Sequence, residues 1–419
     1  RYGSGCQGAL PLLKYQNRGL MLLRGQFHTT YCTNVHPGAN WETTFRALET
    51  HLDTIRASVD PAGPFGLGLR LSDQASRELG LGDRFEEFRD WLEAHHTYVF
   101  TMNGFPFGNF HGQRVKDQVH QPDWTTEPRL EYTLRLFRQL ENLLPPGLEG
   151  GISTSPVSYR HWHPEGPARD AVLRKGARAM AEIALELAGI EARSGKYLHL
   201  DIEPEPDGLL ENSADVIRYF GEFLMPQGVP LLSDRLGVDP ATARTLLLRH
   251  LTLCYDICHF ALAFETPAEV FPRLEAAGIR TGKIQVSAAL RIRPQNGDRE
   301  GVLRALRAFD EPVYLHQVTA RGQEGVHTWP DLPDLLKDPG PFEELRAHFH
   351  VPIFTERYGL LEATQREILE VLDYVKQKPV CSHLEVETYT WEVLPPGLKE
   401  ALPASISREL SWLQRHLES

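Results

Sequence analysis

The stretch Leu251–Glu265, LTLCYDICHFALAFE, decides how the rest of the chain is interpreted. It contains a short apolar strand that ends at Asp256 and His259 and runs directly into a helix. Asp-x-x-His at the exit of a buried strand places a carboxylate and an imidazole on one rim, close enough to share a metal ion or a substrate oxygen. The alternative is a plain helix start, with Asp256 as the N-cap and His259 as a partly exposed neighbour. Other strands of the chain that end in the same way favour the first interpretation.

The composition is that of a globular protein with a large core. The chain has 419 residues, of which 41% are hydrophobic and 24% charged, and its formal net charge is −12. This acidic balance argues against a nucleic-acid partner, because nucleic-acid surfaces need clustered Lys and Arg. The apolar runs are only strand-sized, so we expect no direct insertion into a membrane.

Cysteine usage indicates the compartment. The five cysteines form no Cys-x-x-Cys pair, which fits a reducing environment and gives no support to a structural zinc site. We therefore expect a cytoplasmic protein. Arg1 is not a natural first residue, so the removal of an N-terminal segment stays an open question.

Strand-like and helix-like segments alternate from end to end. This alternation favours a parallel α/β architecture, and the length favours a closed (β/α)₈ TIM barrel. An open, doubly wound sheet is the alternative, but no Gly-x-Gly-x-x-Gly follows the first strand. The eight main strands are predicted within 19–31 and over 65–71, 97–103, 151–155, 197–203, 251–259, 283–288 and 383–389.

No internal repeat or low-complexity linker divides the chain, so we predict a single domain over residues 1–419. An irregular region from about 291 to 356 is predicted to be an inserted flap over one rim, with strand-like pieces at 313–318 and 348–354. An amphipathic C-terminal helix is predicted over 405–417. The other helices are predicted over 40–58, 83–94, 130–144, 167–187, 212–224, 239–250, 267–277 and 364–376.

Several strands carry polar side chains along one face. Residues two apart in a strand share a face, and in a barrel the helix-facing side must be apolar, so the polar faces point into the lumen. Buried charges there are unfavourable unless they pair or bind a cation, and cationic residues are scarce in these strands. A solvated mouth of ion pairs and satisfied histidines is the alternative. The aligned sets are His199, Asp201 and Glu203; Lys283, Gln285 and Ser287; and His383, Glu385 and Glu387.

The glutamates differ in their expected positions. Glu203 is followed by a proline-stiffened segment, in which Glu205 is expected on the loop and in solvent. Glu385 lies two residues before Glu387 and therefore deeper in the barrel. Glu387 is thus the better ligand at the rim.

Loop residues and aromatic side chains are expected to surround a small, partly apolar ligand. His36 and His111 lie on the loops after the first and third strands, and each is equally consistent with an ordinary loop histidine. No Ser-His-Asp elbow, phosphate loop or redox cysteine pair is visible. The candidate substrate-binding residues are His36, Asn103, His111, His316 and Trp391.

The motifs YCTNVHPG, LHLDIEPEPDGLLE, LCYDICHFA, HFHVPIF and HLEVETYTWEVLP together resemble the EboE-type metabolite traffic proteins. These belong to the xylose-isomerase-like TIM barrels, which include ketose 3-epimerases, hydroxypyruvate isomerase and endonuclease IV. The resemblance runs over nearly the whole chain. It implies a divalent metal (Mn, Zn, Co, Fe or Mg) held by two Glu, an Asp and a His.

Carried over by motif, the resemblance implies that Glu203, Asp256 and Glu387 hold the metal. The two glutamates also move protons, and His259 holds the substrate. The fourth ligand departs from the pattern, because the seventh strand has Gln285 where relatives usually have His. An amide oxygen binds a hard cation but suits zinc less well. The alternative fourth ligands, all from the flap, are His316, His348 and His350.

These observations predict a metal-dependent sugar isomerase or epimerase-like enzyme that acts on a small polyhydroxylated or keto metabolite. Glu203 and Glu387 would remove and return a proton next to a metal-polarised carbonyl. The first alternative, implied by the EboE resemblance, is a non-catalytic metabolite-binding or traffic protein with partners in the same biosynthetic cluster. The second is a retaining glycosidase that uses the same glutamates without a metal, at a carboxyl spacing of about 5 Å.

Overall fold

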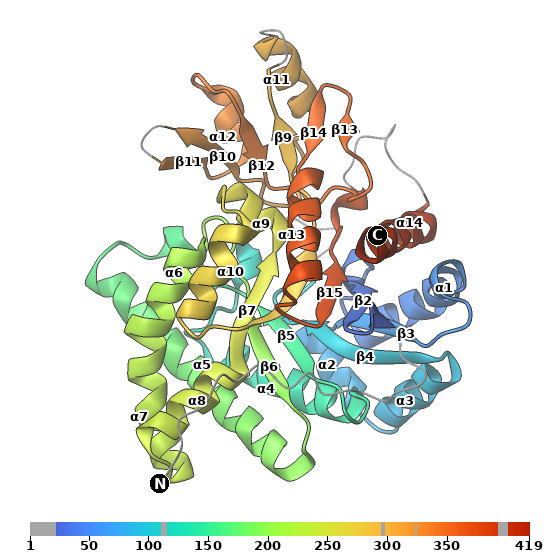
Figure 1. The fold of residues 1–419 in the computed structure, drawn as a ribbon, viewed down its shortest axis with the longest axis vertical. Helices are drawn as coiled ribbons and strands as arrows, with labels where there is room; N and C mark the ends of the chain where they lie inside the picture. Colours follow the sequence, from blue (N-terminus) through green and yellow to red (C-terminus); the bar gives the residue numbers. More distant parts are fainter. Residues whose placement is uncertain (1–21, 110–114, 295–297, 323–324, 393–400) are drawn as a thin grey trace.

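Parallel strands form a closed barrel in the computed structural model, which describes residues 22–109, 115–294, 298–322, 325–392 and 401–419. The eight barrel strands within these ranges are β2 (Phe27–Tyr31), β3 (Phe65–Arg70), β4 (Thr97–Asn103), β5 (Gly150–Thr154), β6 (Leu198–Ile202), β7 (Leu251–Asp256), β8 (Thr281–Val286) and β15 (His383–Val386). They pair in the order β2-β15-β8-β7-β6-β5-β4-β3, and a parallel bridge between Cys32 and Gly68 joins β3 back to β2. The predicted TIM barrel is confirmed (Figure 1).

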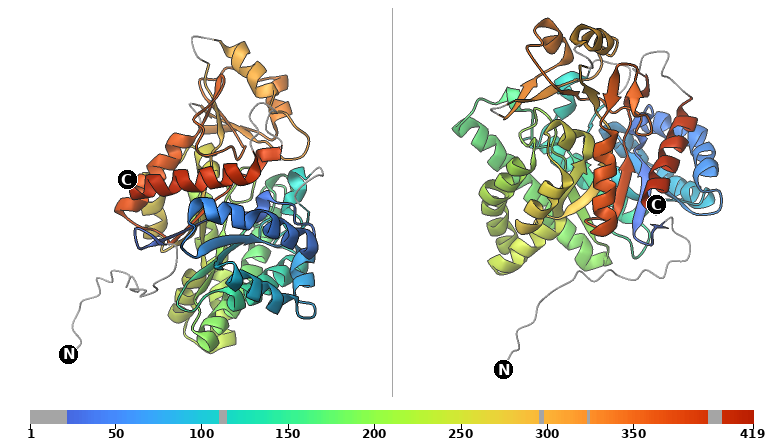
Figure 2. Two further views of the ribbon diagram at one scale, coloured as in Figure 1. Left: turned by 90° about the vertical axis from the view of Figure 1, so that its right-hand side faces the viewer. Right: turned by 45° about the horizontal axis from the view of Figure 1, so that its top comes forward.

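Helices cover the outside of the barrel (Figures 1 and 2). The helix predicted over 212–224 begins as α6 (Ser213–Arg218), passes through a π-helical segment, Tyr219–Leu224, and continues as α7 (Met225–Leu236). The predicted C-terminal helix is α14 (Leu402–Glu418), which packs against α1. The other helices around the barrel are α1 (Trp41–Val59), α2 (Asp73–Leu79), α3 (Arg84–Ala94), α4 (Glu127–Leu143), α5 (Pro167–Ser194), α8 (Pro240–His250), α9 (Ile257–Leu262), α10 (Pro267–Ala276) and α13 (Gln365–Gln377).

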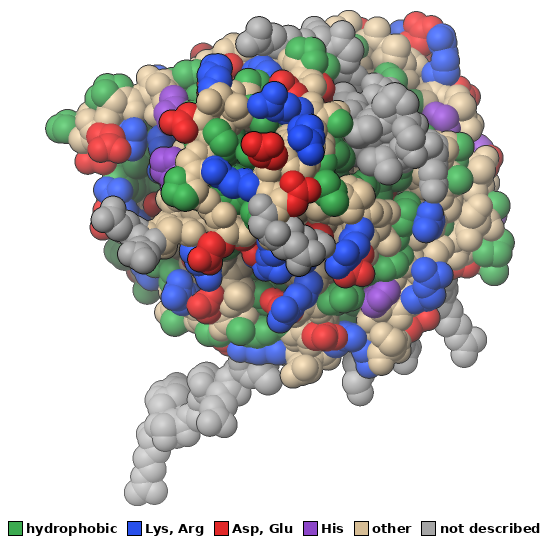
Figure 3. All heavy atoms as spheres, turned by 90° about the horizontal axis from the view of Figure 1, so that it is seen from above, with side chains coloured by type: hydrophobic (Ala, Val, Ile, Leu, Met, Phe, Trp, Pro, Cys, Tyr) green, Lys and Arg blue, Asp and Glu red, His purple; other side chains and the backbone are tan. Residues whose placement is uncertain are grey.

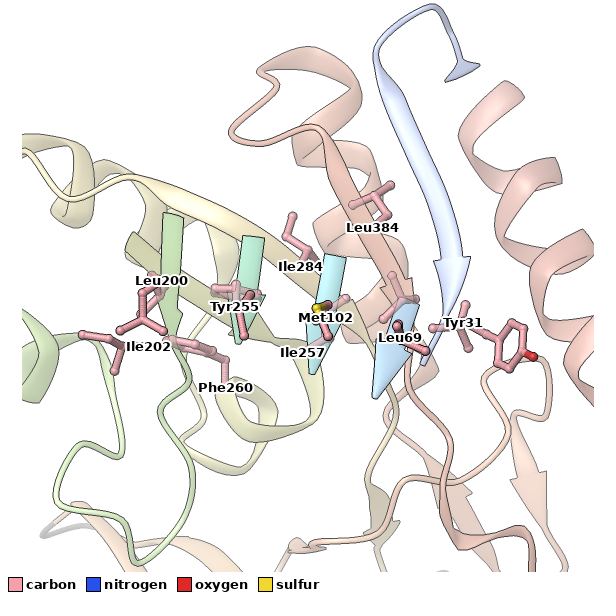
Figure 4. Close-up of a cluster of buried hydrophobic side chains, with 14 of the residues drawn as sticks. Tyr31, Leu69, Met102, Leu200, Ile202, Tyr255, Ile257, Phe260, Ile284 and Leu384 are labelled. Carbon is pink, nitrogen blue, oxygen red and sulfur yellow. The ribbon is translucent and has the colours of Figure 1, made fainter. Parts of the chain in front are cut away.

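The helix-facing sides of the strands are apolar, as predicted. Figure 4 shows this buried layer, in which Leu200, Ile284 and Leu384 belong to three different strands. Along each strand, the apolar residues alternate with polar residues that lie on the opposite face. Tyr255 stacks on Phe260 with ring centroids 4.1 Å apart, so α9 packs back onto the strand that precedes it.

The lumen below the rim holds a buried polar layer. Lys283 Nζ lies 2.6 Å from Glu385 Oε2, and both side chains are fully buried. His199 Nδ1 lies 2.6 Å from Asp201 Oδ1. Gly282 leaves space for this pair, because a Cβ there would overlap the Asp201 carboxylate. Glu385 is therefore deep in the barrel, as predicted, and its charge is paired.

The predicted flap is a second sheet over one end of the barrel, between β8 and α13 (Figures 1 and 2). Its strands in the described residues pair antiparallel throughout, in the order β11-β10-β12-β9-β14-β13. The elements are β9 (Leu290–Ile292), α11 (Arg299–Arg307), β10 (Val318–Gly322), β11 (Gly325–Trp329), α12 (Leu332–Lys337), β12 (Leu345–Ala347), β13 (Arg357–Tyr358) and β14 (Leu361–Ala363).

The two strands predicted inside the flap are wrong. Residues 313–317 and 348–354 are irregular, and the ladders form on either side of them instead. The reason is local, because Phe349 N donates to Ala347 O in a tight turn directly after β12. Side-chain hydrogen bonds, rather than a ladder, then hold His348 and His350.

Hydrogen bonds attach the flap to the end of α9. Arg346 Nη1 donates to Ala261 O at 2.6 Å, and Thr319 Oγ1 donates to Leu262 O at 2.8 Å.

Lys, Arg, Asp and Glu side chains are interspersed over the outer face of the molecule seen from this end (Figure 3). In the ranges that the structure describes, none of the helices has the length and apolar character needed to cross a bilayer.

Candidate metal centre

A cavity lies between the carboxyl ends of the barrel strands and the flap. The lining of the cavity combines polar and apolar groups. Carboxylate, imidazole and amide groups from the strand ends and the flap make up its polar part, and its apolar part includes Phe105, Val115, Tyr314 and Tyr389.

Three carboxylates from three strands meet at this end of the barrel. Glu203 follows β6, Asp256 ends β7 and Glu387 follows β15, and one oxygen from each lies within 4.8 Å of those of the others. All three side chains are buried. Glu203 Oε2 and Asp256 Oδ2 have no hydrogen-bond partner among the described residues. We call this group the carboxylate trio; such a group is strongly unfavourable when ionised unless a cation neutralises it.

The two glutamates of the trio are difficult to ionise without such a cation. Burial raises the pKa of Glu203 well above its ordinary value, and the neighbouring Glu387 and Asp256 raise it further. Burial also raises the pKa of Glu387 well above its ordinary value, with additional contributions from Asp256 and Glu385. Carboxyls with raised pKa values in a cavity are typical of groups that exchange protons or bind cations.

Asp256 has two roles, one for each oxygen. Its Oδ1 accepts hydrogen bonds from the His259 amide at 3.1 Å and from Ser287 Oγ at 2.7 Å, which makes it the N-cap of α9. The helix-start interpretation therefore holds for Oδ1, while Oδ2 accepts no hydrogen bond from the described residues. His259 is only 3% exposed, so the partial exposure that the helix-start alternative gave it is wrong.

Two amides orient Glu387. Asn34 Nδ2 and Asn103 Nδ2 donate to Glu387 Oε1 at 2.7 and 2.9 Å. The structure thus places Asn103 in the cavity wall, as a partner of a glutamate. Asn34 was not among the predicted site residues, although its place in the loop directly after the first barrel strand was the available signal.

Three imidazoles converge on the same cavity. His348 Nε2 lies 3.1 Å from His259 Nε2 and 3.3 Å from His350 Nε2. Burial lowers the pKa of His348 well below its ordinary value, and burial lowers the pKa of His350 to about 4. Both rings are therefore neutral at neutral pH.

The expectation that Glu205 is solvated on a loop is wrong. Glu205 is 6% exposed and lines the cavity, with Oε1 2.8 Å from His120 Nε2. Its main-chain NH donates to Leu210 O, so the Glu-Pro-Glu-Pro segment folds back toward the barrel instead of extending into solvent. A carboxylate oxygen of Glu205 and nitrogens of His259 and His348 lie within 4.8 Å of one another.

Gln285 is buried inside the barrel and does not line the cavity. Its Oε1 accepts a hydrogen bond from Cys254 Sγ at 3.2 Å. The histidines at this end of the barrel are better placed as a fourth donor, because His259 and His350 each have a ring nitrogen within 4.8 Å of an Asp256 oxygen. The metal role of Gln285 stays a prediction.

Two other predicted substrate contacts lie outside the cavity wall. His36 Nε2 is 3.0 Å from the Tyr31 hydroxyl, and its ring stacks on His51 with centroids 4.9 Å apart. Trp391 is buried, and it also does not line the cavity. His111 lies outside the described residues.

His316 organises the flap and does not line the cavity. Its Nδ1 lies 2.8 Å from His348 O, and its Nε2 lies 2.7 Å from Glu311 Oε1. Both ring nitrogens are thus engaged, Nδ1 with the backbone of His348 and Nε2 with the Glu311 side chain. Because both ring nitrogens are engaged, His316 has no free nitrogen with which to act as the fourth ligand.

The sequence matches no protein-family model and no curated protein. Among solved structures it is similar to a D-tagatose 3-epimerase-like protein, at 11% identity and a TM-score of 0.47, over 94% of this chain and 97% of the other. It is also similar to the IolI protein with a bound zinc atom, at 11% identity and a TM-score of 0.45, over 94% and 98%. A xylose isomerase-like TIM barrel protein from Mycobacterium smegmatis, in complex with magnesium, has 12% identity and a TM-score of 0.46, over 94% and 96%. At these values the likeness concerns the barrel fold alone.

Proposed function

We propose that this protein is a metal-dependent isomerase or epimerase-like enzyme that moves a proton next to the carbonyl of a small polyhydroxylated metabolite. The carboxylate trio, with its two unpaired buried oxygens, carries the proposal. Lys116, the cationic side chain among the described residues of the cavity wall, is already paired with Asp331 at 2.7 Å. When its glutamates are ionised, the trio therefore needs a cation from outside the chain.

The donor set fits a divalent cation. Glu203, Asp256 and Glu387 would hold it, with an imidazole of His259 or His350 as the fourth donor in place of Gln285. Carboxylate oxygens suit Mg and Mn, and the addition of an imidazole extends the range to Zn, Co and Fe. The unpaired Glu203 Oε2 and Asp256 Oδ2 are the atoms that such an ion would satisfy.

A bound cation supplies Lewis acidity that polarises a substrate carbonyl and its neighbouring hydroxyl. The chain's own residues move the proton. Glu203 and Glu387 have raised pKa values, so each holds a proton more readily than an ordinary carboxyl does. In the proposed reaction one of the two glutamates removes the proton and the other returns it. The amides of Asn34 and Asn103 hold Glu387 in one orientation during this exchange.

The cavity suits a small substrate that has both polar and apolar surface. The amide and imidazole groups of Asn103, His120 and Gln317 offer hydrogen bonds to hydroxyls, while Phe105 and Tyr389 supply apolar contact. A short sugar chain has both kinds of surface.

Two other functions remain alternatives. A retaining glycosidase would use Glu203 and Glu387, whose carboxylate oxygens lie within 4.8 Å of each other, but it would give the third carboxylate of the trio, Asp256, no role. A metabolite-binding or traffic protein, which the EboE resemblance implies, would use the same pocket without turnover and would have partners encoded in the same cluster. Neither alternative exchanges a proton next to a substrate carbonyl, so an exchange experiment distinguishes both from the proposed enzyme.

Deuterium incorporation tests the proposal. Wild-type protein loaded with Mn²⁺ and incubated with a panel of keto sugars in D₂O should introduce deuterium at the carbon next to the carbonyl, read by mass spectrometry. Glu203→Gln and Glu387→Gln should lower the exchange rate by about 10²–10⁴-fold. Glu211→Gln is the control, because Glu211 is a partly buried glutamate of the same segment that does not line the cavity.

Other outcomes would point to the alternatives. Substrate binding without exchange by the metal-loaded protein would favour the traffic protein. Cleavage of glycosides by metal-free protein would favour the glycosidase.

A further inference from the structure

The described lining of the cavity is accessible to solvent mainly along one seam. Its residues are buried with four exceptions, which are partly exposed: Lys116, Val119, Leu315 and Tyr389. The first two belong to the segment Val115–His120 between β4 and α4, which we call the rim segment, and Leu315 belongs to the flap. The seam between the rim segment and the flap is therefore where a ligand from solvent meets the cavity.

Polar contacts close this seam. The main-chain NH groups of Val115 and Lys116 both donate to Val313 O, at 2.8 and 3.2 Å. Lys116 Nζ lies 2.7 Å from Asp331 Oδ2, and the two side chains are only 11% and 18% exposed. An ion pair that is partly buried is screened less by salt than one in open solvent. One carbonyl and one carboxylate of the flap thus hold the beginning of the rim segment.

The apolar contacts across the seam are few. Val115 and Tyr314 form a small cluster of their own, apart from the main core, and Val119, Val313 and Tyr389 pack against it. The rings of Tyr314 and Tyr389 meet edge to face, with centroids 5.3 Å apart. Parts of a protein with few buried apolar contacts open at a lower free-energy cost than the core does. The seam is therefore a place where local opening is expected.

The flap side of the seam is held by contacts of its own. Glu311 accepts hydrogen bonds from the main-chain NH groups of Val313 and Tyr314, at 2.7 and 2.9 Å. Asp331 Oδ1 accepts one from His316 N at 3.0 Å, which fixes the carboxylate that Lys116 contacts. These contacts stay in place when the rim segment moves, so the movable side of the seam is the rim segment.

Within the rim segment, only the beginning is held by the flap. Asp117 Oδ2 accepts a hydrogen bond from Trp162 Nε1 at 3.0 Å, and the buried His120 lies 2.8 Å from Glu205, so these residues attach the segment to the barrel. Lys116 has a φ of +45°, which is unfavourable for a residue with a side chain. Its contacts with the flap must compensate for this conformation, which can relax once they break.

We propose that Val115 and Lys116 form a gate that closes the cavity against the flap, with the Lys116–Asp331 ion pair as its latch. Opening breaks the contacts with Val313 and Asp331 and separates the seam, while residues 117–120 stay attached to the barrel. Closing shields the buried carboxylates from solvent. The inference does not rest on the proposed function, because an enzyme and a binding protein need the same access to this cavity.

Thiol labelling tests the gate. Phe105 lines the cavity and is 6% exposed, so Phe105→Cys places a thiol that a reagent reaches only after an opening. In metal-free protein, modification of this thiol by N-ethylmaleimide, followed by peptide mass spectrometry, should be about 5-fold faster when Lys116→Met or Asp331→Asn is added. Lys337→Met is the matched control, because it breaks an exposed ion pair of the same flap, with Asp334 at 3.0 Å.

Two internal comparisons separate gating from other causes. Cys32 is buried in the barrel, and its labelling in the same samples should stay unchanged, because it reports on opening of the core. The double variant Lys116→Met/Asp331→Asn should label position 105 no faster than either single variant, because all three lack the same ion pair.

Several outcomes would overturn the inference. Equal labelling rates at position 105 with and without the latch would show that the ion pair does not control access. Faster labelling of both position 105 and Cys32 would show unfolding of the barrel. If Phe105→Cys does not fold, hydrogen exchange at the Val115 and Lys116 amides decides: faster exchange in Asp331→Asn than in wild type supports the gate, and equal exchange contradicts it.

Discussion

His348 Nε2 lies 3.1 Å from His259 Nε2, across 89 positions of sequence. The contact joins the flap to the helix that follows β7, at the place where the carboxylate trio gathers. The flap therefore forms part of the wall of the cavity and is more than a cover over it. Changes in the flap should be detected at the site itself.

The side chain that supports His348 provides a first prediction. Gln317→Ala removes the oxygen that holds His348, whose Nε2 lies 3.1 Å from Nε2 of His259, a candidate fourth donor. Loss of such a supporting group typically weakens metal binding about 10–100-fold, and we expect that decrease in Zn²⁺ affinity here. Competition with a chromophoric chelator measures it. Gln365→Ala, which also removes a glutamine bonded to a main-chain oxygen of the flap, should leave the affinity unchanged.

Metal binding should release protons. Burial and mutual repulsion raise the pKa values of Glu203 and Glu387, so the metal-free protein holds protons there above the ordinary pH range of a carboxyl. A cation binds the ionised forms, and its affinity should therefore increase with pH. Titration calorimetry with Mn²⁺ in two buffers of different ionisation enthalpy measures the protons released. Glu203→Gln should release fewer than wild type, and equal heats in the two buffers would contradict the assignment.

The buried pair in the barrel floor predicts a strong asymmetry between single and double variants. Lys283→Met leaves the Glu385 carboxylate buried without its partner and should lower the free energy of unfolding by about 3–5 kcal/mol. The double variant Lys283→Met/Glu385→Gln removes both charges and should recover part of the loss. Urea unfolding measures both values. A double variant that is no more stable than Lys283→Met would show that the charge pairing is not the cause.

A buried glutamate of the C-terminal helix predicts a pH dependence of stability. Burial raises the pKa of Glu409 to about 8, while its Oε1 accepts hydrogen bonds from Thr388 Oγ1 and Ile353 N. At pH values between the ordinary carboxyl pKa and about 8, the Glu409 carboxyl is protonated in the folded protein but ionised in the unfolded chain. Its stabilising contribution is therefore complete at low pH and is lost as the pH rises through this range.

Glu409→Gln keeps an acceptor oxygen and should remove this pH dependence. At the alkaline end of the range, the free energy of unfolding of wild type should have fallen by up to roughly 5 kcal/mol more than that of the variant. Melting temperatures of wild type and variant across the range measure the difference. Glu418→Gln, on an exposed position of the same helix, is the control. Parallel pH profiles of wild type and Glu409→Gln would contradict the raised pKa.

The barrel and the trio could be predicted because both follow from short-range rules. Alternation along a strand determines which side chains share a face, and parallel strands bring their carboxyl ends to one rim. Glu203, Asp256 and Glu387 all lie at such ends, so the structure brings them together as the spacing indicates.

The remaining parts of the cavity depend on contacts between distant segments. The alternation in HFHVPIF resembles a strand, yet a tight turn after Ala347 makes the segment irregular. The burial of Glu205 depends on a hydrogen bond to Leu210 that follows the prolines, and no periodic pattern indicates it. The pairing of Lys283 with Glu385 likewise joins two strands, which is why the lumen has one neutralised glutamate below the trio.

Anomalous diffraction from crystals soaked in Mn²⁺ tests the central claim most directly, because it locates the ion with respect to the trio. The account predicts a manganese peak at bonding distance, about 2.0–2.3 Å, from oxygens of Glu203, Asp256 and Glu387, and no such peak in Glu203→Gln crystals. Absence of a peak at the trio in wild-type crystals, or a peak only at other residues, would contradict it.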